Sequence, residues 1–349
     1  MPTVKIADHQ IGDGQKSLIV AEIGINHNGE EELAHKMVDA IADGGADCVK
    51  FQTFTAADFM NGADQRFEYL SQGKLVTESM LAMFQRHELA AEAFFKLYDH
   101  ACERGLVPLS TPTDPQAVDL LDKIGFPAFK IGSDDIVHTP FLKYVARKNK
   151  PMIISTGMAD KADVSRAANV ISDTGNEDLI ILHCVSLYPT PDENVNLSRI
   201  MSLKNDFPHP IGFSDHSDGI TAAIGATMIG ACLIEKHFTL DRNLPGPDHH
   251  FSSDPSEFAN LVKEVRRLET QIGGSARDPV IAEKDMAAIA RRSIVINRDV
   301  PADHVLSDED LSYRRPGTGL MPYERDNVIG RRTRQPIVKG TLLSFSMLD

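Results

Sequence analysis

The chain has 349 residues, and its 36 basic and 50 acidic side chains give a formal net charge of −14 at pH 7. A chain this acidic is a poor partner for nucleic acid or for an anionic membrane, although it can still hold a local cationic pocket. The length exceeds that of one ordinary domain and predicts a large domain followed by a small one.

The four cysteines, Cys48, Cys102, Cys184 and Cys232, form no C-x-x-C pair. Three of them lie in apolar runs, where we expect buried free thiols. The start of the sequence shows no signal-peptide pattern, and no apolar run is long enough to span a bilayer. We therefore expect a cytoplasmic protein without a membrane partner.

Strand-like and helix-like segments alternate through most of the chain. The predicted strands are largely apolar, as expected when both faces are buried, and span residues 17–23, 48–52, 107–111, 128–131, 152–156, 179–184, 211–215 and 232–237. The predicted helices span residues 31–44, 89–105, 115–125, 139–149, 161–173, 197–206, 219–230 and 255–271. This alternation predicts an α/β fold, a (β/α)8 TIM barrel of parallel strands.

A doubly wound open sheet would alternate in the same way. However, no G-x-G-x-x-G follows the first strand, and polar residues suited to chemistry follow almost every strand. These residues include Lys50, Lys130, His183, Ser214, His216 and His237. In a parallel barrel they would converge on one open face.

Three segments depart from the alternation. Residues 54–88 form a long connection, which we interpret as a lid or a partner-contacting excursion. Residues 1–15 carry Val4, Ile6 and Ile11 in alternation, and we expect them to plug the N-terminal mouth of the barrel. After a barrel domain at 1–272, the small residues around Gly273 indicate a linker at 273–290.

The last segment, residues 291–349, reads as a small β-rich domain. It contains the β-like pieces SIVI and TLLSF, separated by turn-rich sequence. About sixty residues make a domain of marginal stability, so we expect this one to pack on another surface.

His216 and His237 close two consecutive predicted strands. Because side chains alternate along a strand, Ser214 shares a face with His216, and Glu235 shares one with His237. Two imidazoles on neighbouring strand ends can bind one divalent cation and leave positions open for water or substrate. The alternative is two unrelated polar caps on the barrel rim. Residues 214–216 are not a hydrolase triad, because neighbouring strand residues face opposite sides.

Lys50 and Lys130 lie inside apolar strands, where a lysine is costly unless it meets an anion. Phosphate or carboxylate binding is the natural use. The alternatives are an internal ion pair with Glu22 or Asp135, or a Schiff-base lysine.

Other polar residues follow the strands. Thr111, Ser133 and Ser155 stand at successive strand ends near glycines, where backbone N–H groups can approach an anion. Glu22 closes the first strand and is either a general base or a partner for a lysine. Asp248 follows the last strand and either grips substrate hydroxyl groups or forms a turn.

Six longer motifs stand out in the barrel domain: AEIGINHNG at 21–29, VKFQTF at 49–54, ISTGMA at 154–159, IGFSDHS at 211–217, IEKHFTLD at 234–241 and GPDH at 246–249. These motifs resemble the sialic acid synthase family. The tail, with RPGTGL at 315–320, resembles the antifreeze-like SAF domain of that family. The resemblance spans nearly the whole chain in order.

The resemblance implies a transferase that condenses phosphoenolpyruvate with an N-acyl mannosamine-type sugar such as N-acetylmannosamine, giving a nonulosonic acid and phosphate by C–O cleavage. It implies a divalent metal on His216 and His237, Mn2+ before Mg2+ or Co2+, and catalytic roles for these two residues, Glu22 and Asp135. The positions implied to bind substrate are Lys50, Gln52, Thr111, Lys130, Ser133, Ser155, Ser186, Tyr188, Ser214, Asp248 and Arg315. Arg315 would enter the barrel of a second subunit, so a domain-swapped homodimer is expected.

Two departures from the neuraminate synthases bear on the sugar. Asp135 stands where they have a glutamate, and Val185 replaces an asparagine, whose contact Ser186 could supply. A legionaminic or pseudaminic acid synthase acting on a 6-deoxy diacetamido sugar is therefore an alternative. A Schiff-base aldolase using Lys130 or Lys236 is a second, and an ice- or glycan-binding protein a third.

Overall fold

The computed structural model describes residues 3–60, 65–273 and 280–349. The chain divides into two compact units, residues 1–273 and 274–349. Each unit has its own apolar core. Cys48, Cys184 and Cys232 are buried free thiols, as the sequence predicted. In the part of the chain that is described, no helix is both long and apolar enough to cross a bilayer.

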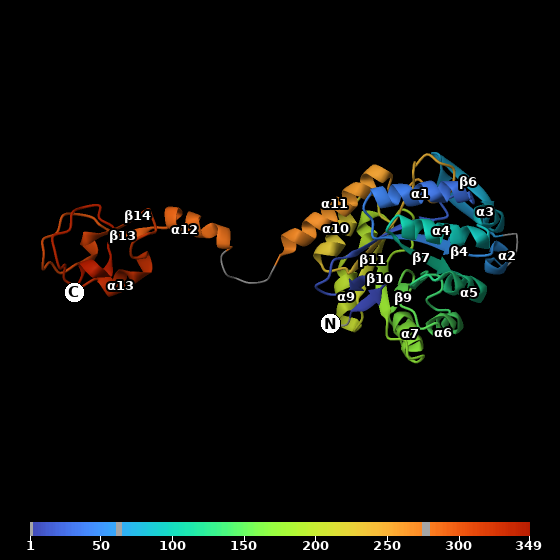
Figure 1. The fold of residues 1–349 in the computed structure, drawn as a ribbon, viewed down its shortest axis with the longest axis horizontal. Helices are drawn as coiled ribbons and strands as arrows, with labels where there is room; N and C mark the ends of the chain where they lie inside the picture. Colours follow the sequence, from blue (N-terminus) through green and yellow to red (C-terminus); the bar gives the residue numbers. More distant parts are fainter. Residues whose placement is uncertain (1–2, 61–64, 274–279) are drawn as a thin grey trace. The chain divides into compact units, whose positions relative to one another are not determined.

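The first unit is a closed barrel of eight parallel strands arranged in chain order (Figure 1). The strands are β3 (Leu18–Gly24), β4 (Cys48–Thr53), β7 (Val107–Pro112), β8 (Phe129–Ile131), β9 (Met152–Ser155), β10 (Leu179–Cys184), β11 (Ile211–Asp215) and β12 (Leu233–His237). The last strand pairs with the first, which closes the ring. The predicted barrel is confirmed, and every predicted strand lies within two residues of an observed one.

Helices cover the outside of the strands (Figure 1). They are α1 (Glu31–Asp43), α4 (Ala91–Glu103), α5 (Pro115–Ile124), α6 (Thr139–Ala146), α7 (Lys161–Ser172), the short α8 (Asp192–Val195), α9 (Ser198–Asp206), α10 (Thr221–Met228) and α11 (Pro255–Ile272). Helix α5 shows how the sequence sets such a helix. Asp114 caps its start by accepting a hydrogen bond from the N–H of Ala117 at 2.7 Å, and Gly125 ends it with a φ of 112°.

A two-stranded N-terminal hairpin plugs one end of the barrel. Strands β1 (Val4–Ile6) and β2 (His9–Ile11) pair antiparallel. Val4, Ile6 and Ile11 are buried in one cluster with inward-facing barrel residues such as Leu109 and Leu182. The predicted plug is confirmed, and it makes this end of the barrel apolar and closed.

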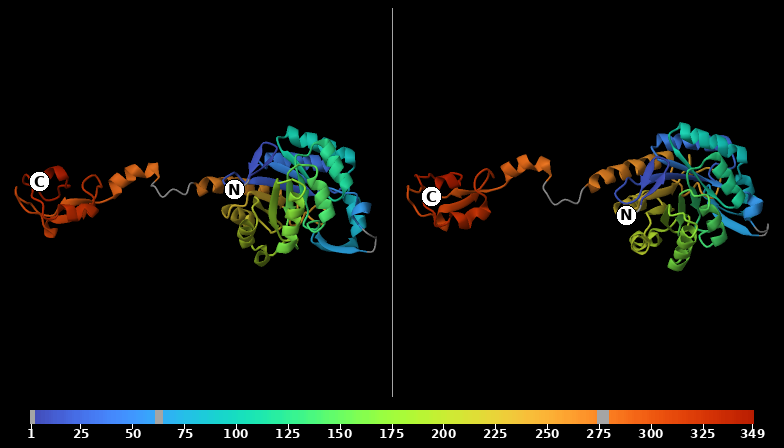
Figure 2. Two further views of the ribbon diagram at one scale, coloured as in Figure 1. Left: turned by 90° about the horizontal axis from the view of Figure 1, so that it is seen from below. Right: turned by 60° about the horizontal axis from the view of Figure 1, so that its bottom comes forward.

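The long connection after β4 folds into α2 (Ala56–Phe59), the hairpin β5 (Arg66–Ser71) and β6 (Lys74–Ser79), and α3 (Met80–His87). The hairpin lies at the opposite end of the barrel from the N terminus (Figures 1 and 2). Its tip is tied to the loop after β12. Ser71 Oγ accepts a hydrogen bond from the N–H of Gly246 at 3.1 Å, and Gln72 Nε2 donates one to the carbonyl oxygen of Asn243 at 3.0 Å.

The second unit has its own small core. Its elements are η1 (Ile281–Glu283), α12 (Lys284–Ala290), β13 (Ser293–Ile296), η2 (Asp308–Asp310), β14 (Leu311–Arg314), η3 (Pro322–Glu324), α13 (Arg325–Val328) and η4 (Phe345–Met347). Strands β13 and β14 pair antiparallel over a cluster that includes Ile294, Val300 and Leu343.

Two details of the second unit differ from the sequence analysis. The SIVI segment is β13, but TLLSF is not a strand, because only Leu342 bridges to Val295. Residues 281–290, which the sequence assigned to the linker, form η1 and α12. Residues 284–290 are rich in alanine, which favours a helix even beside the small residues of 273–275.

The plug generates a stability prediction. Ile11→Ala removes a side chain that is 0% exposed and leaves a cavity among barrel residues, so unfolding should become easier by about 3 kcal/mol. Urea unfolding followed by circular dichroism measures this. Lys5→Ala, at an exposed position of the same hairpin, is the control and should stay within about 0.5 kcal/mol of the parent chain. Equal effects of the two changes would show that the plug is not part of the core.

Candidate active site

A cavity of about 470 Å³ opens at the C-terminal ends of the strands, and each of the eight barrel strands contributes to it. The predicted site residues among its lining are Glu22, Lys50, Gln52, Thr111, Lys130, Ser133, Ser155, Ser186, Tyr188, Ser214, His216 and His237. Because parallel strands all end at the same face, residues far apart in sequence meet here. The plug closes the other end.

Two lysines and two glutamates form the floor of the cavity, and each is nearly inaccessible to solvent. Lys50 Nζ lies 2.7 Å from Glu22 Oε2 and 3.7 Å from Glu235 Oε2. Lys130 Nζ lies 4.0 Å from Glu235 Oε1. The internal ion pair that the sequence left open for Lys50 is therefore present with Glu22. Buried charges of this kind are tolerated only when they are paired and hydrogen-bonded.

Hydroxyl groups complete the coordination of the lysines. Lys50 Nζ donates to Thr111 Oγ1 at 3.0 Å, and Lys130 Nζ donates to Ser155 Oγ at 2.7 Å. Ser214 Oγ donates to Glu235 Oε1 at 2.8 Å. These contacts fix the ammonium groups in the cavity, where they can also face a bound anion.

The pKa values of the two glutamates are shifted in opposite directions. Burial raises the pKa of Glu22, against the opposing effect of Lys50, and Glu235 raises it further. Burial also acts to raise the pKa of Glu235, but Lys130 and Lys50 outweigh it and lower that pKa. Glu235 is thus held as the carboxylate, while Glu22 is the carboxyl group more ready to hold a proton.

Glu235 was not among the predicted site residues, although it contacts both lysines. The signal was present in the sequence, because Glu235 lies two positions before His237 and shares its face of the strand. The parallel register pairs it with Ser214. Only the closed barrel shows that Lys50 and Lys130 lie across from it.

His216 and His237 lie side by side, with ring centroids 5.3 Å apart. His216 Nδ1 is 2.9 Å from the carbonyl oxygen of Val185; a carbonyl only accepts, so Nδ1 carries the proton and Nε2 is left with its lone pair. His237 Nδ1 is buried without a hydrogen-bond partner among the described residues, and Asp248 Oδ2 is 3.8 Å from it. Burial, followed by the nearby His216, lowers the pKa of His237 well below its usual value, so this ring is neutral.

Burial acts to lower the pKa of His216, but the nearby Cys184 and the Val185 carbonyl outweigh it and raise that pKa. In their unprotonated forms, the adjacent imidazoles of His216 and His237 could both bind a divalent cation. Within the described residues, no group of three or more His, Cys, Asp or Glu side chains could hold a metal ion. A cation on His216 and His237 would therefore need further ligands from water or substrate. Positions filled by water or substrate are a feature of catalytic rather than structural metal sites.

Ser133 and Ser186 line the upper part of the cavity. Ser133 Oγ accepts a hydrogen bond from the N–H of Gly157 at 3.0 Å and donates to Cys184 Sγ at 3.5 Å. Ser186 Oγ is buried and, among the described residues, has no partner. Tyr188 packs against His216, with ring centroids 4.3 Å apart and ring planes tilted by 38°.

The remaining candidates are not part of this lining: Asp135, His183, Lys236, Arg315 and Asp248, the last of which lines the adjoining cavity. Asp134, not Asp135, is part of the lining. Burial, with Asp134 nearby, raises the pKa of Asp135 to about 6. His183 bonds the carbonyl oxygen of Val195 at 2.7 Å, which removes it from the site. Lys236 pairs with Asp215 at 3.0 Å, also away from the cavity, and Arg315 belongs to the second unit.

A second cavity of about 770 Å³ adjoins the first. The two share seven lining residues: Gln52, Phe67, Met80, Phe84, Ser186, Tyr188 and His237. Asp248 lines this outer cavity, and burial, with Glu22, raises its pKa to about 7. The excursion after β4 supplies much of the outer wall.

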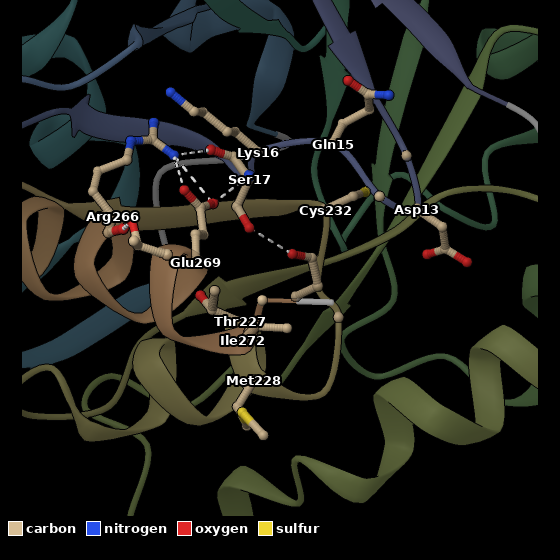
Figure 3. Close-up of a pocket in the computed structure, with 16 residues that line it drawn as sticks. Asp13, Gln15, Lys16, Ser17, Thr227, Met228, Cys232, Arg266, Glu269 and Ile272 are labelled. Atoms are coloured by element: carbon tan, nitrogen blue, oxygen red, sulfur yellow. Dashed lines mark hydrogen bonds and ion pairs between the residues drawn. The ribbon is translucent and has the colours of Figure 1, made fainter. Parts of the chain in front are cut away.

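Another cavity, of about 670 Å³, lies between the loop after β2 and the ends of α10 and α11 (Figure 3). Glu269 accepts hydrogen bonds from the N–H of Ser17 at 2.6 Å and from Arg266 at 3.1 Å, and Arg266 also donates to the carbonyl oxygen of Ser17. These groups satisfy one another. We interpret this end of the barrel as structural, in keeping with barrel enzymes generally.

The geometry defines a barrel enzyme whose site combines buried ammonium groups with a pair of imidazoles. Residues 37–277 match the NeuB family model, and residues 291–349 match the SAF domain. The chain belongs to the NeuB family, whose named members here are synthases of sialic, legionaminic and pseudaminic acids.

Individual relatives match over nearly their whole length. The N,N'-diacetyllegionaminic acid synthase of Legionella pneumophila is 38% identical, with 97% of this chain and 96% of that protein covered. Human N-acetylneuraminate-9-phosphate synthase is 30% identical, with 97% and 94% covered. The solved N-acetylneuraminic acid synthetase from Leptospira borgpetersenii, in complex with citrate, has a TM-score of 0.74 at 30% identity and covers 82% of this chain and 95% of that one.

The lysine–glutamate floor generates a prediction. Glu235→Gln leaves Lys130 with no carboxylate at 4.0 Å and Lys50 with Glu22 alone, so the free energy of unfolding should fall by about 3 kcal/mol. Chemical denaturation measures it. The control is Ser214→Ala, which removes only the 2.8 Å hydrogen bond to Glu235 and should cost about 1 kcal/mol. Indistinguishable losses would mean that Glu235 does not balance the lysines.

Proposed function

We propose that this enzyme condenses phosphoenolpyruvate with an N-acyl mannosamine-type sugar to give a nonulosonic acid and phosphate. The supporting observation is that Lys50 and Lys130 meet in one cavity with His216 and His237. The ammonium groups suit a small phosphorylated acid, and the imidazoles suit a cation beside it. Membership of the NeuB family supports the same reaction.

Phosphoenolpyruvate would bind on the floor of the inner cavity. Lys50 and Lys130 face it as cations, and the hydroxyl groups of Thr111, Ser155 and Ser214 are already oriented by the lysines and Glu235. Ser133 and the unpartnered hydroxyl of Ser186 supply further donors, and Gln52 is held by its 2.9 Å bond to Glu22. Val185 contributes its carbonyl oxygen to His216 rather than a side-chain amide.

His216 and His237 are the residues that would hold the divalent metal, Mn2+ before Mg2+ or Co2+. When bound, it would act as a Lewis acid toward the aldehyde of the open-chain sugar. The protein's own part is to orient the imidazoles: the Val185 carbonyl accepts a hydrogen bond from His216 Nδ1, and burial keeps His237 unprotonated.

The reaction joins carbon 3 of phosphoenolpyruvate to the aldehyde carbon, adds water at carbon 2, and releases phosphate by breaking the C–O bond. Glu22 is placed to hold and return a proton at this site, since burial raises its pKa and its carboxylate contacts Lys50 and Gln52. Asp248 faces the outer cavity, where sugar hydroxyl groups would lie. The alternative 6-deoxy diacetamido substrate fits the same chemistry equally well.

One competing function has an observation in its favour. Burial lowers the pKa of Lys130, which is a property of Schiff-base lysines. Lys130 nevertheless already donates hydrogen bonds to Ser155 and to the carbonyl oxygen of Ile131. Lys236, the other lysine proposed for an aldolase, is bound to Asp215 and Ser217 away from the cavity.

Phosphate release tests the proposed reaction. Purified enzyme should release phosphate only when phosphoenolpyruvate, an N-acyl mannosamine-type sugar and a divalent metal are all present. EDTA should abolish turnover, and Mn2+ should restore it. His216→Ala and His237→Ala should each reduce turnover by more than about 100-fold, since even outer partners of metal ligands are worth 10–100-fold. His138→Ala, at an exposed residue outside both cavities, is the matched control.

Two results would contradict the proposal. Full turnover in EDTA, or in both histidine variants, would remove the metal from the mechanism. Borohydride trapping of a pyruvate adduct on Lys130 would favour the aldolase instead. Circular dichroism of the variants separates a lost ligand from a lost fold.

We also propose a cytoplasmic homodimer in which Arg315 of one subunit serves the sugar site of the other. The segment before the SAF-matching residues supports an interface, because Val280, Ile281, Met286 and Ile289 are all largely exposed to solvent. Exposed apolar groups of this kind mark protein contacts. The arrangement would also give the small second unit a surface on which to pack.

Complementation between subunits tests this arrangement. Arg315→Ala should raise the KM for the sugar far more than that for phosphoenolpyruvate. Co-expressed in equal amounts, Arg315→Ala and His216→Ala chains should recover about a quarter of the parent activity, because half of the dimers are mixed and each has one intact site. No recovery, in mixed dimers verified by differential tags, would place Arg315 in its own subunit's site or outside the site altogether.

A further inference from the structure

We infer that the outer cavity selects a sugar whose last carbon is an apolar methyl group, with Phe67, Met80 and Phe84 as the residues that contact it. This inference rests on the proposed function and deepens it. It assigns a specificity role to the excursion between β4 and α4. It also chooses between the two sugar classes that the family allows.

The first step is the path of the sugar. The aldehyde carbon must lie near His216 and His237, which line the inner cavity. His237 also lines the outer cavity, whose wall includes Asp248. The carbon atoms most remote from the aldehyde therefore extend into the outer cavity. Its volume of about 770 Å³ falls within the range of small-molecule sites.

The second step is the chemistry of the wall. Phe67 on β5 and Met80 and Phe84 on α3 line both cavities, so the substrate passes them on its way to His237. Beyond them the outer cavity is continued by Ile25, Met83 and Leu187. Against Phe67, Met80 and Phe84 themselves, a hydroxyl group would lose water without gaining a strong hydrogen-bond partner, whereas a methyl group would gain contact. The polar side chains of the outer cavity, such as Asp248, remain available to the other hydroxyl groups of the sugar.

The third step is charge. The charged side chains that line the outer cavity are Glu68, Asp218 and Asp248, and no lysine or arginine is among the described residues of its lining. A phosphate ester on the last carbon would thus meet carboxylates and no cation of the barrel. The absence of such a cation from the described lining distinguishes this chain from the human relative, whose name specifies a 9-phosphate product. Of the two relatives, the diacetyllegionaminic acid synthase is also the more similar in sequence, at 38% identity against 30%.

The wall is held in place rather than loose. Arg86 on α3 donates two hydrogen bonds to Glu78 on β6, at 2.9 and 2.7 Å, and Tyr69 donates one at 2.5 Å to the same carboxylate. At the other end, Ser71 and Gln72 hold the loop after β12. Phe67 and Tyr69 stack with ring centroids 5.6 Å apart. Hydrogen bonds at both ends of this wall hold its side chains in position. A wall fixed in this way can discriminate between substrates because it does not change shape to fit each of them.

Three matched sugars test the inference. They are diacetamido aldoses identical except at the last carbon, which is a methyl group, a hydroxymethyl group or a phosphate ester. Phosphate release from phosphoenolpyruvate should show a kcat/KM about 10- to 100-fold higher for the methyl sugar than for the hydroxymethyl sugar. The phosphorylated sugar should be the poorest substrate of the three.

Variants connect the preference to the wall. Phe67→Ser should reduce the methyl preference at least several-fold and leave the KM for phosphoenolpyruvate unchanged. Met80→Lys should improve relative use of the phosphorylated sugar by adding a cation. Phe95→Ser, at a partly exposed phenylalanine on α4 that lines neither cavity, should leave the preference as it was. Thermal unfolding checks that each variant is folded. If Phe67→Ser does not fold, Met80→Lys still tests the role of the wall.

The outcomes distinguish a failure of the proposed function from a failure of the methyl-group inference. No phosphate release from any sugar overturns the proposed function and this inference with it. Release at equal kcat/KM from the methyl and hydroxymethyl sugars overturns the inference alone, as does a methyl preference that survives both wall variants. A preference that falls in Phe67→Ser but not in Phe95→Ser supports it.

Discussion

The burial of two ammonium groups beside two carboxylates is the constraint on which the rest of the structure depends. Lys50, Lys130, Glu22 and Glu235 are each no more than 5% exposed. Moving such charges out of water is expensive, and the cost is offset only when opposite charges and hydroxyl groups lie within contact distance. The closed barrel brings these groups into contact. The register between β3 and β4 places Glu22 beside Lys50, and the pairing of β12 with β3, which closes the ring, places Glu235 on the strand next to that of Glu22.

This constraint divides the barrel into two halves with different chemistry. The N-terminal half is filled by Leu109, Leu182 and their neighbours, together with the β1–β2 plug, and is closed and apolar. The C-terminal half is polar at its floor, because its buried charges need hydroxyl partners. The rigid half fixes the positions of the strand ends, and the polar half uses those positions for chemistry.

The excursion after β4 adds what the barrel itself lacks. The floor of the inner cavity is polar and would hold the reacting groups, while the hairpin and α3 bring aromatic and sulfur-containing side chains to its outer edge. The same segment contacts the loop after β12, so it links two strands that are not neighbours in sequence. In the proposed function, reaction type and substrate selection would reside on different parts of the same unit.

Sequence patterns predicted the barrel, its strands and nine residues of the inner cavity, because buried parallel strands are continuous apolar runs and their polar ends must gather at one face. The family resemblance added Gln52, Ser186 and Tyr188 to the residues that line this cavity. The plug followed from the same reasoning. The sequence did not identify Glu235 as the partner of both lysines, because that contact depends on ring closure between strands far apart in the chain. It also favoured Asp135 where the lining uses Asp134, and it expected a strand at TLLSF.

The outer cavity was decided by tertiary structure only. Phe67, Met80 and Phe84 belong to a segment without barrel periodicity, and nothing local shows that a hairpin will return to meet the loop after β12. Patterning is a local property of the chain, and it fixes which residues are buried and where strands end. Which buried residues face one another across a cavity depends on long-range closure, and closure exists only in the folded protein.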